Sequence, residues 1–304
     1  MPAVKKAAFV TIVGRPSAGK STLLNRFCGE KVAIVSPVPQ TTRNAVRGIV
    51  NREQGQLVFV DTPGRHVSEK KFNKKLMEVG ERSIEEADIV LYTLDASRMP
   101  AEEEEAVVSL VAPLREKVVF ALNKIDAPRA DPQALLNFLN EKIGPVEGGR
   151  VFKISALKNE GVESLLDCLF SLAPEGDAFY PEEFYTDQEV SFRIAEIIRE
   201  KAIRHLRQEI PHSIYVDVAD AELKTLPEGG QKLWVRAFIV TERESQKGMV
   251  VGKGGAMIKQ IRLEALKDLK RIFDWKLELD LRVKTAHDWR HNDATLRRLI
   301  RSEV

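Results

Sequence analysis

The chain has 304 residues, of which 43% are hydrophobic and 30% charged, and its net charge is +2. This length exceeds what one compact core usually holds, and the composition is too apolar for a disordered chain, so we expect two globular domains. Cys28 and Cys168 are too few and too far apart in sequence for a disulfide framework, which indicates a reducing cytosol. No apolar run is long enough for a membrane-spanning helix, although peripheral attachment to a membrane stays open.

The first half of the chain alternates short apolar runs with longer polar-apolar segments. Fully apolar strands alternating with helices are typical of a mostly parallel sheet that helices cover on both faces. We therefore predict an α/β domain over residues 1–173. Strands are predicted at 9–13, 57–60, 89–94, 118–122 and 151–154, and helices at 21–28 and 101–114.

The pattern changes at residues 173–183, where two prolines and a glycine interrupt an aperiodic stretch. We predict a linker at 174–188 and a second domain, of α+β class, at 189–304. Its order is helix, strand, strand, helix, strand, with a glycine turn before the long second helix. Helices are predicted at 194–206, 258–272 and about 288–302, and strands at 214–218, 233–240 and 277–283.

Gly14–Ser21 fits the pattern G-x-x-x-x-G-K-[ST] between a predicted strand and a predicted helix, which is the context of a phosphate loop. Glycines let the backbone N–H groups surround phosphates, and the helix N-terminus adds a favourable dipole. Lys20 would reach the β- and γ-phosphates, and the Ser21 hydroxyl would ligate Mg²⁺. The predicted nucleotide contacts are Gly14, Arg15, Pro16, Ser17, Ala18, Gly19, Lys20, Ser21 and Thr22.

The sequence 123–126, Asn-Lys-Ile-Asp, follows a predicted strand at its carboxyl end, where α/β sheets bind ligands. The Asp126 carboxylate would accept hydrogen bonds from N1–H and the 2-amino group of guanine. Adenine lacks this donor pair, so the site selects guanine. Asn123 would tie this base loop to the phosphate loop, and the stem of Lys124 would cover the base. After the last strand, Ser155 and Ala156 would donate backbone N–H groups to guanine O6.

Asp61, Thr62, Pro63 and Gly64 follow another predicted strand. The carboxylate of Asp61 would hold Mg²⁺, usually through water. The backbone N–H of Gly64 would approach the γ-phosphate and move when that phosphate leaves.

Together these motifs resemble the translation-factor-like class of P-loop GTPases. Within that class, residues 40–43 resemble the first switch, and by this resemblance Thr42 would coordinate Mg²⁺ in the GTP state. Thr41 is a competing ligand, and an ordinary polar loop is the alternative for the whole segment. The resemblance makes Lys20, Thr42 and Gly64 the catalytic candidates, and Ser21, Thr42 and Asp61 the metal ligands.

Arg65 stands where the Ras template has a glutamine that orients water, and where many GTPases of this branch have an apolar residue. Arg65 could stabilise charge or simply face solvent. We therefore predict slow intrinsic GTP hydrolysis that depends on positioning and Mg²⁺.

A second motif, G-x-x-G, occurs at 252–255 before an apolar helix. KH domains clamp about four nucleotides of single-stranded RNA with such a loop. Residues 245–271 carry seven Lys/Arg against two acids, a footprint for phosphate backbones. A helix-capping turn beside a solvated helix face is the alternative. The predicted RNA-binding residues are Gly252, Lys253, Gly254, Gly255, Lys247 and Lys259.

A P-loop GTPase domain joined to a C-terminal type II KH domain resembles the Era family of bacterial GTPases, as do residues 180–188, 197–201 and 243–252. The resemblance covers essentially the whole chain. It implies GTP/GDP and Mg²⁺ as cofactors, binding to the 3′ end of 16S rRNA, and a role in maturing the 30S ribosomal subunit. It also implies a cytoplasmic monomer, a fraction of which lies peripherally on the inner face of the cell membrane. Ser17-Ala18 departs from the usual Asn-Val of the family, and we expect little change in loop packing.

Other interpretations stay open. The phosphate loop could serve a transferase or kinase, although the base loop argues against ATP, and the second domain could bind protein or membrane. His287 and His291 are four residues apart on the predicted last helix, but lack a third metal ligand, so we expect surface or RNA-facing side chains. We expect residues 102–105, four glutamates, to form a solvated helix start.

Overall fold

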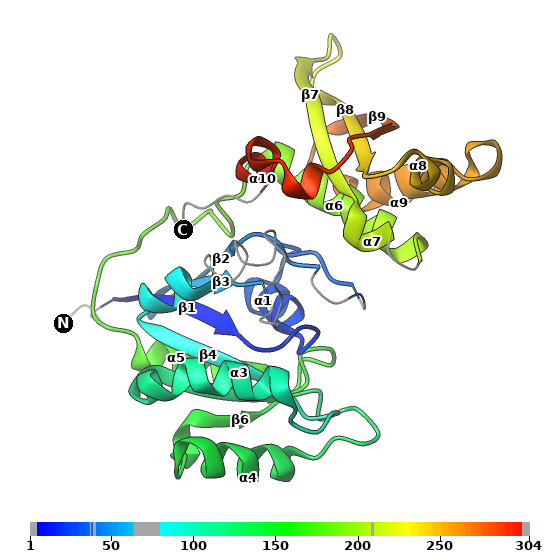
Figure 1. The fold of residues 1–304 in the computed structure, drawn as a ribbon. Coiled ribbons are helices and arrows are strands. Elements are labelled where there is room, and N and C mark those ends of the chain that lie inside the picture. The colour runs from blue at the N-terminus through cyan, green and yellow to red at the C-terminus, as the bar shows by residue number, and fades with distance from the viewer. Residues whose placement is uncertain (1–4, 37, 39–40, 64–79, 208–209, 300–304) are drawn as a thin grey trace. The chain divides into compact units, whose positions relative to one another are not determined.

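The computed structural model describes residues 5–36, 38, 41–63, 80–207 and 210–299. The chain divides into two compact units, one lying mainly within residues 1–187 and the other within 188–296 (Figure 1). The division between residues 187 and 188 falls inside the linker predicted at 174–188.

The first unit is built on a six-stranded sheet in the order β2-β3-β1-β4-β5-β6. β2 pairs antiparallel with β3, and the other pairings are parallel. Every residue of β3, β4 and β5 is buried, as expected of parallel strands covered on both faces. The strands are β1 (Lys6–Val13), β2 (Val46–Arg52), β3 (Gly55–Asp61), β4 (Ile89–Asp95), β5 (Val118–Asn123) and β6 (Val151–Lys153).

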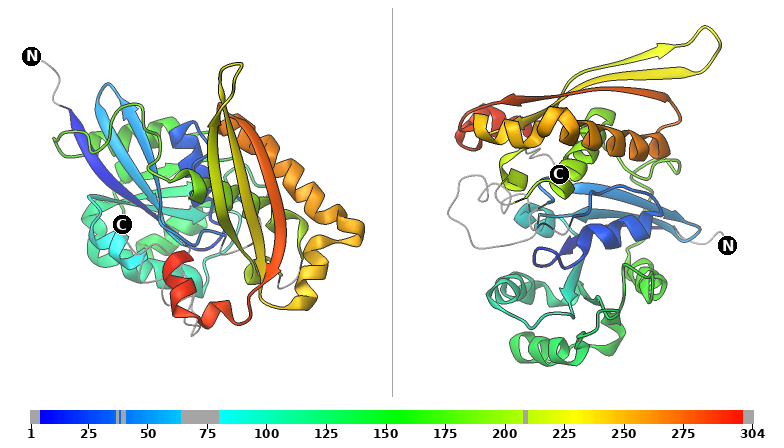
Figure 2. Two further views of the ribbon diagram at one scale, coloured as in Figure 1. Left: turned by 90° about the horizontal axis from the view of Figure 1, so that it is seen from above. Right: turned by 90° about the vertical axis from the view of Figure 1, so that its right-hand side faces the viewer.

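Helices cover both faces of this sheet (Figure 2). α1 (Lys20–Cys28) and α5 (Val162–Leu172) pack on one face. α3 (Glu102–Val111) and α4 (Pro132–Ile143) pack against β4 and β5 on the other. The 3₁₀ turn η1 (Ala112–Lys117) ends the helix predicted to reach residue 114. The sequence did not single out β2, because this edge strand mixes two arginines and an asparagine with its apolar residues.

The predicted linker is bound along the first unit. Ala7 N donates to Pro174 O at 3.0 Å, and Ile49 N on β2 donates to Tyr185 O at 3.0 Å. The buried side chain of Gln56 accepts hydrogen bonds from the backbone N–H groups of Phe179 and Tyr180, at 2.8 and 3.0 Å. Individual polar contacts and the ring of Phe179, which packs on Phe9 with the centroids 4.5 Å apart, hold this segment. Such contacts require no regular period in the sequence.

The second unit has a three-stranded sheet in the order β7-β8-β9, in which β7 and β8 are antiparallel and β8 and β9 parallel. The order helix–strand–strand–helix–helix–strand is that of the predicted type II KH arrangement. Its elements are α6 (Val190–His205), α7 (Ile210–Ser213), β7 (Tyr215–Thr225), β8 (Gln231–Thr241), α8 (Glu244–Val251), η3 (Lys253–Gly255), α9 (Ala256–Ile272), β9 (Lys276–Thr285), η4 (Trp289–His291) and α10 (Asp293–Leu299).

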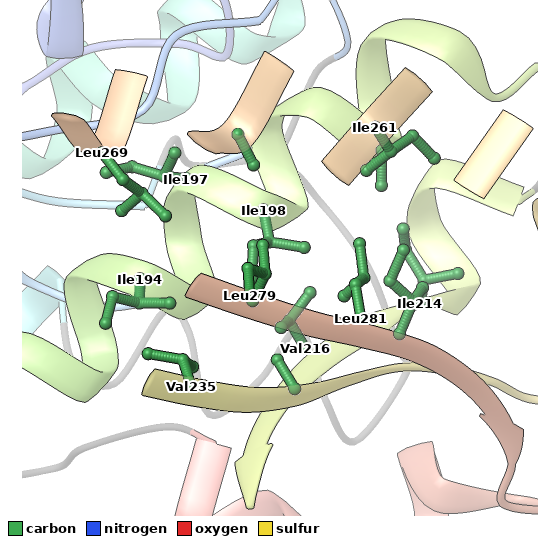
Figure 3. Packing of buried hydrophobic residues seen from close by; sticks show 14 of the residues in the cluster. Ile194, Ile197, Ile198, Ile214, Val216, Val235, Ile261, Leu269, Leu279 and Leu281 are labelled. Carbon is green, nitrogen blue, oxygen red and sulfur yellow. The ribbon is translucent and has the colours of Figure 1, made fainter. Parts of the chain in front are cut away.

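The core of the second unit lies between α6, α9 and one face of the sheet (Figure 3). Ile198 on α6 and Ile261 on α9 are fully buried there, and in Figure 3 Ile198 lies next to Leu279 on β9. Along β8 and β9 alternate side chains point to this core or away from it, which produces the period-two pattern of the sequence.

The predicted helix at 288–302 is wrong at its start. Asp288 adopts a left-handed conformation (φ 50°), and a 3₁₀ turn follows before α10 begins at residue 293. The buried Trp289 donates its indole N–H to Ser213 O at 3.1 Å, which holds the turn in place. His287 and His291 therefore do not share a helical face, and no cluster of three potential metal ligands occurs in the described part of the chain.

Across the ranges that the structure describes, none of the helices combines the length and apolar character needed to cross a bilayer.

The substitution Ile198→Ala should destabilise the second unit by about 2–5 kcal/mol, because it leaves a cavity in a fully buried position. All three tryptophans (Trp234, Trp275 and Trp289) belong to this unit, so tryptophan fluorescence during urea unfolding reports on it selectively. Leu263→Ala, at a position that is 51% exposed, is the control and should leave the urea midpoint nearly unchanged. Equal midpoints for both variants would contradict the assigned core.

Candidate functional site

The phosphate loop connects β1 to α1 through backbone conformations that need glycine. Gly14 has φ 151°, and a Cβ there would lie 2.3 Å from Thr93 O. Gly19 has φ 100°, and a Cβ there would lie 2.3 Å from the side-chain nitrogen of Asn123. A side chain at position 14 would therefore collide with the backbone of β4, and one at position 19 would collide with the Asn123 amide.

Ser17 lies in the same loop at φ 62°, the left-handed region that asparagine adopts more readily than serine. Ala18, the other position at which the loop departs from the family pattern, is fully buried. At Ser17 the serine carries a backbone cost that asparagine would reduce.

Lys20 begins α1 and is 6% exposed. Its ammonium donates to Gly14 O at 2.9 Å and to Arg15 O at 3.0 Å, so it lies across the phosphate loop. Burial lowers the pKa of Lys20, against the attraction of Asp61 and Glu104. A buried ammonium held by neutral carbonyl groups is suited to the negative charge of phosphate oxygens.

Three oxygen ligands converge beside Lys20. The Ser21 hydroxyl donates to Asp61 Oδ2 at 2.5 Å, and Thr42 Oγ1 lies 3.1 Å from Ser21 Oγ. Asp61 Oδ1 is buried without a hydrogen-bond partner among the described residues, and burial raises the pKa of Asp61 to about 6. Carboxylate and hydroxyl oxygens with an unsatisfied acceptor fit a hard cation such as Mg²⁺.

The two threonines of the predicted switch have different partners. Thr41 is buried and its hydroxyl donates to Val38 O at 2.6 Å, whereas Thr42 faces Ser21. This geometry favours Thr42 as the metal ligand. Thr62 is anchored by a hydrogen bond from its hydroxyl to Ile12 O at 2.8 Å. Gly64, Arg65 and Gln40, which the sequence also marked, lie outside the described residues.

Asn123 joins three loops. Its side-chain nitrogen donates to Ala18 O of the phosphate loop at 2.8 Å. Its Oδ1 accepts from Ala156 N at 3.0 Å. Both contacts are buried, so they hold the base loop, the phosphate loop and the 155–157 loop in a fixed arrangement. Asp126, in the same base loop, is partly exposed, which leaves its carboxylate accessible to a base.

The predicted backbone donors for guanine O6 have protein partners. Ser155 N donates to Glu160 O at 3.0 Å, and Ala156 N donates to Asn123 Oδ1. A guanine O6 would therefore have to share these N–H groups. The sequence missed Arg26 on α1, which donates to Ala156 O at 2.9 Å and to Leu157 O at 2.7 Å and holds this loop from the other side.

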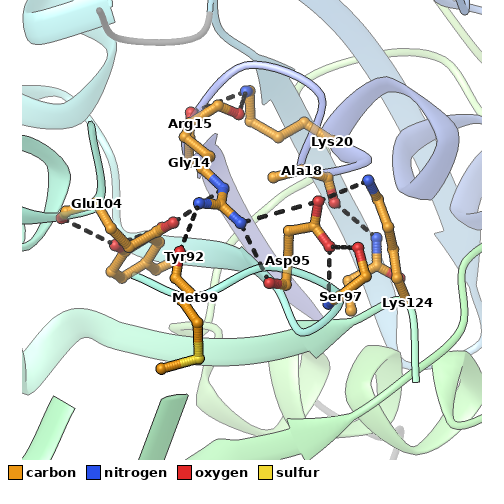
Figure 4. Close-up of polar contacts among 11 residues, drawn as sticks. Gly14, Arg15, Ala18, Lys20, Tyr92, Asp95, Ser97, Met99, Glu104 and Lys124 are labelled. Carbon is orange, nitrogen blue, oxygen red and sulfur yellow. Dashed lines mark hydrogen bonds and ion pairs between the residues drawn. The ribbon is translucent and has the colours of Figure 1, made fainter. Parts of the chain in front are cut away.

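The predicted solvated helix start at 102–105 is wrong for Glu104 (Figure 4). Glu104 is fully buried, 3.1 Å from Arg15 Nε, and its Oε1 accepts the Tyr92 hydroxyl at 2.8 Å. A run of four glutamates gave no sign that one of them faces inward. Asp95 was also missed, although a carboxylate directly after an apolar strand was the same signal that marked Asp61.

The G-x-x-G loop of the second unit joins α8 to α9 in left-handed conformations, with φ 73° at Gly252, 59° at Gly254 and 78° at Gly255. A Cβ at Gly252 would lie 2.6 Å from Met257 Cβ, whereas Gly254 and Gly255 face open space. Of the predicted basic contacts, Lys253 and Lys259 are exposed. Lys247 is paired with Glu244 at 2.9 Å, so part of its charge is neutralised.

Two family models match the chain: "50S ribosome-binding GTPase" over residues 9–124 and "KH domain" over residues 209–290. GTPase Era of Treponema denticola is 52% identical over 290 residues, covering 95% of this chain and 98% of the relative. GTPase Era of Borreliella burgdorferi is 44% identical over 295 residues, covering 97% and 99%.

Two solved structures share the complete architecture. Aquifex aeolicus Era bound to GDP and AlF₄⁻ superimposes with a TM-score of 0.89 at 32% identity, covering 98% of this chain and 100% of that one. Era in complex with MgGDPNP and nucleotides 1506–1542 of 16S ribosomal RNA gives 0.89 at 33% identity, covering 99% and 100%. The predicted fold class is confirmed for both units.

The substitution Gly19→Ala should weaken GDP binding by about tenfold or more, because its Cβ would displace the Asn123 side chain from Ala18 O and strain the backbone. Gly29→Ala is the matched control at the other end of α1, since Gly29 also has a positive φ but faces open space. Titration calorimetry with GDP should show a loss for the first variant alone. If both variants lost a comparable amount of GDP affinity, backbone strain would explain the effect, and the contact between Asn123 and Ala18 would not.

Proposed function

Because the chain belongs to the Era family of GTPases, we propose that it couples its GTP cycle to binding of the 16S rRNA 3′ end during maturation of the 30S subunit. The protein binds GTP and GDP with Mg²⁺ and hydrolyses GTP to GDP and phosphate. The observation that carries the coupling proposal is that one chain holds both a nucleotide site, with its phosphate loop, oxygen ligands and base loop, and an open G-x-x-G loop.

In the nucleotide site, we assign the phosphate contacts to the backbone N–H groups of residues 14–22, except Pro16, which has none. The ammonium of Lys20 adds a side-chain contact to the phosphates. Ser21, Thr42 and Asp61 would hold Mg²⁺, which supplies charge neutralisation for the β- and γ-phosphate oxygens when bound. Thr62 and Pro63 lead into the segment that would meet the γ-phosphate. Asp126 selects guanine, while Asn123 and Lys124 position the base loop. Hydrolysis would then be slow, because it depends on positioning and charge.

For the second unit, we assign RNA binding to the G-x-x-G loop with Lys253 and Lys259. The open space at Gly254 and Gly255 allows a nucleic-acid backbone to approach, and the two exposed lysines supply positive charge. The solved Era complex with 16S rRNA nucleotides 1506–1542 supports this choice of ligand over a protein or membrane.

The same proposal includes a monomer in the cytoplasm that associates with the 30S subunit, a fraction of it lying peripherally on the inner face of the cell membrane. These points follow from the family resemblance. Co-sedimentation with 30S subunits and flotation with anionic lipid vesicles test them separately.

Thr42→Ala should reduce the affinity for a non-hydrolysable GTP analogue in Mg²⁺ by about tenfold, because the metal loses a hydroxyl ligand. Thr41→Ala should keep that affinity within about twofold, since the Thr41 hydroxyl bonds to Val38 O instead. Titrations with GDP and with the analogue, in Mg²⁺ and in EDTA, separate the two variants. The reverse pattern would move the switch ligand to Thr41.

Gly254→Asp should weaken binding of an RNA oligonucleotide carrying the 16S 3′ end by about tenfold at physiological salt, because the carboxylate repels phosphates. Gly254→Asn is the matched control, since it adds the same volume at the same φ without charge. Gly252→Asp is a poorer test, because its Cβ would collide with Met257. GTP binding should be unchanged in both Gly254 variants. Unchanged RNA affinity of Gly254→Asp would reject this loop as the RNA site.

A further inference from the structure

One buried carboxylate, Asp95, connects the two loops that recognise opposite ends of the nucleotide (Figure 4). Asp95 ends β4 and is 1% exposed. In the sheet, β4 lies between β1, which leads into the phosphate loop, and β5, which leads into the base loop. The carboxyl end of β4 is therefore the place from which a single side chain can reach both.

On the phosphate side, Asp95 contacts the buried guanidinium of Arg15. Arg15 Nη2 donates to the Asp95 main-chain carbonyl at 3.3 Å and lies 3.9 Å from its Oδ2. The Arg15 carbonyl in turn accepts from Lys20 at 3.0 Å. Fixing the Arg15 side chain therefore also fixes the backbone against which Lys20 rests.

On the base side, Asp95 Oδ2 accepts from Lys124 Nζ at 2.7 Å. Lys124 has φ 66°, a conformation unfavourable for a residue with a side chain, so its place in the base loop depends on such contacts. Asp95 Oδ1 is satisfied separately by Ser97, from the backbone N–H at 3.0 Å and the hydroxyl at 2.5 Å. These two bonds leave Oδ2 for the two cations.

Glu104 acts on the phosphate side alone. Its Oε2 lies 3.1 Å from Arg15 Nε but is not aligned for a hydrogen bond, so the attraction is electrostatic. Its Oε1 is held by the Tyr92 hydroxyl. Both carboxylates are buried, so removing either charge leaves the Arg15 guanidinium undercompensated in a low-dielectric environment.

We propose that Asp95 is a positioning residue that couples the phosphate loop to the base loop through Arg15 and Lys124, and that Glu104 positions the phosphate loop alone. Phosphate recognition and guanine recognition then reinforce each other, since each ordered loop holds the shared carboxylate for the other. The inference rests on guanine-nucleotide binding at this site.

The test compares GDP with IDP, whose base lacks the 2-amino group that Asp126 would accept. Asp95→Asn should lower GDP affinity by about tenfold or more and also lower the ratio of GDP to IDP affinity. Glu104→Gln should lower both affinities and change the ratio much less than Asp95→Asn does, because it perturbs Arg15 but leaves the bond between Asp95 and Lys124 intact. Glu105→Gln is the matched control on the next residue of α3, because Glu105 makes an exposed pair with Lys142. It should behave as wild type.

Lys124→Ala provides a second readout that does not depend on altering the core, since the Lys124 side chain is 35% exposed. Inorganic pyrophosphate has no base, yet the coupling predicts that this base-loop variant binds it several-fold more weakly, as measured by competition with GDP. A wild-type GDP-to-IDP ratio in Asp95→Asn, or wild-type pyrophosphate affinity in Lys124→Ala, would overturn the coupling. A wild-type protein that does not prefer GDP to IDP would instead reject the proposed guanine site.

Discussion

The nucleotide site depends on the buried amide of Asn123. One side chain donates to Ala18 O and accepts from Ala156 N, so three loops that are far apart in sequence keep a single geometry. This arrangement requires a glycine at position 19, because a Cβ would occupy the space that the Asn123 nitrogen uses. The amide matters because each loop alone is a flexible connection, and a nucleotide that touches all three would otherwise bear the entropy of ordering them.

Buried charge is the second feature of this site. Lys20, Arg15, Asp61, Asp95 and Glu104 are almost completely removed from solvent within one unit. Buried charges are tolerated when they are paired and hydrogen-bonded, and Arg15 meets this condition through its two carboxylates. Lys20 and Asp61 are paired less completely. Neutral carbonyl groups hold the Lys20 ammonium, and Oδ1 of Asp61 has no hydrogen-bond partner among the described residues. In the proposed site, phosphates would supply the charge opposite to Lys20 and Mg²⁺ the charge opposite to Asp61, so burial of both groups would favour binding of these ligands.

In the second unit the hydrophobic core and the G-x-x-G loop are made of different residues. The core is an aliphatic layer between α6, α9 and one sheet face, and none of the four loop residues 252–255 belongs to it. Within that loop Gly252 packs against Met257 and is structural, whereas Gly254 and Gly255 face solvent. The packing therefore distinguishes Gly252, which the turn itself requires, from the two glycines of the same loop that a ligand could approach.

Local patterns in the sequence were sufficient for the phosphate loop, the base loop, the alternation of strands and helices and the G-x-x-G turn, because each depends on residues close together in the chain. The sequence could not show that Glu104 faces inward, that Asp95 lies between two loops, that residues 174–187 run along the first unit, or that Ser155 and Ala156 have protein partners. Those facts depend on which strand ends become neighbours in the sheet order β2-β3-β1-β4-β5-β6. The chain alone marked the residues that we propose contact the nucleotide. The tertiary structure decided which residues hold them in place, because a buried charge is recognised only by what surrounds it.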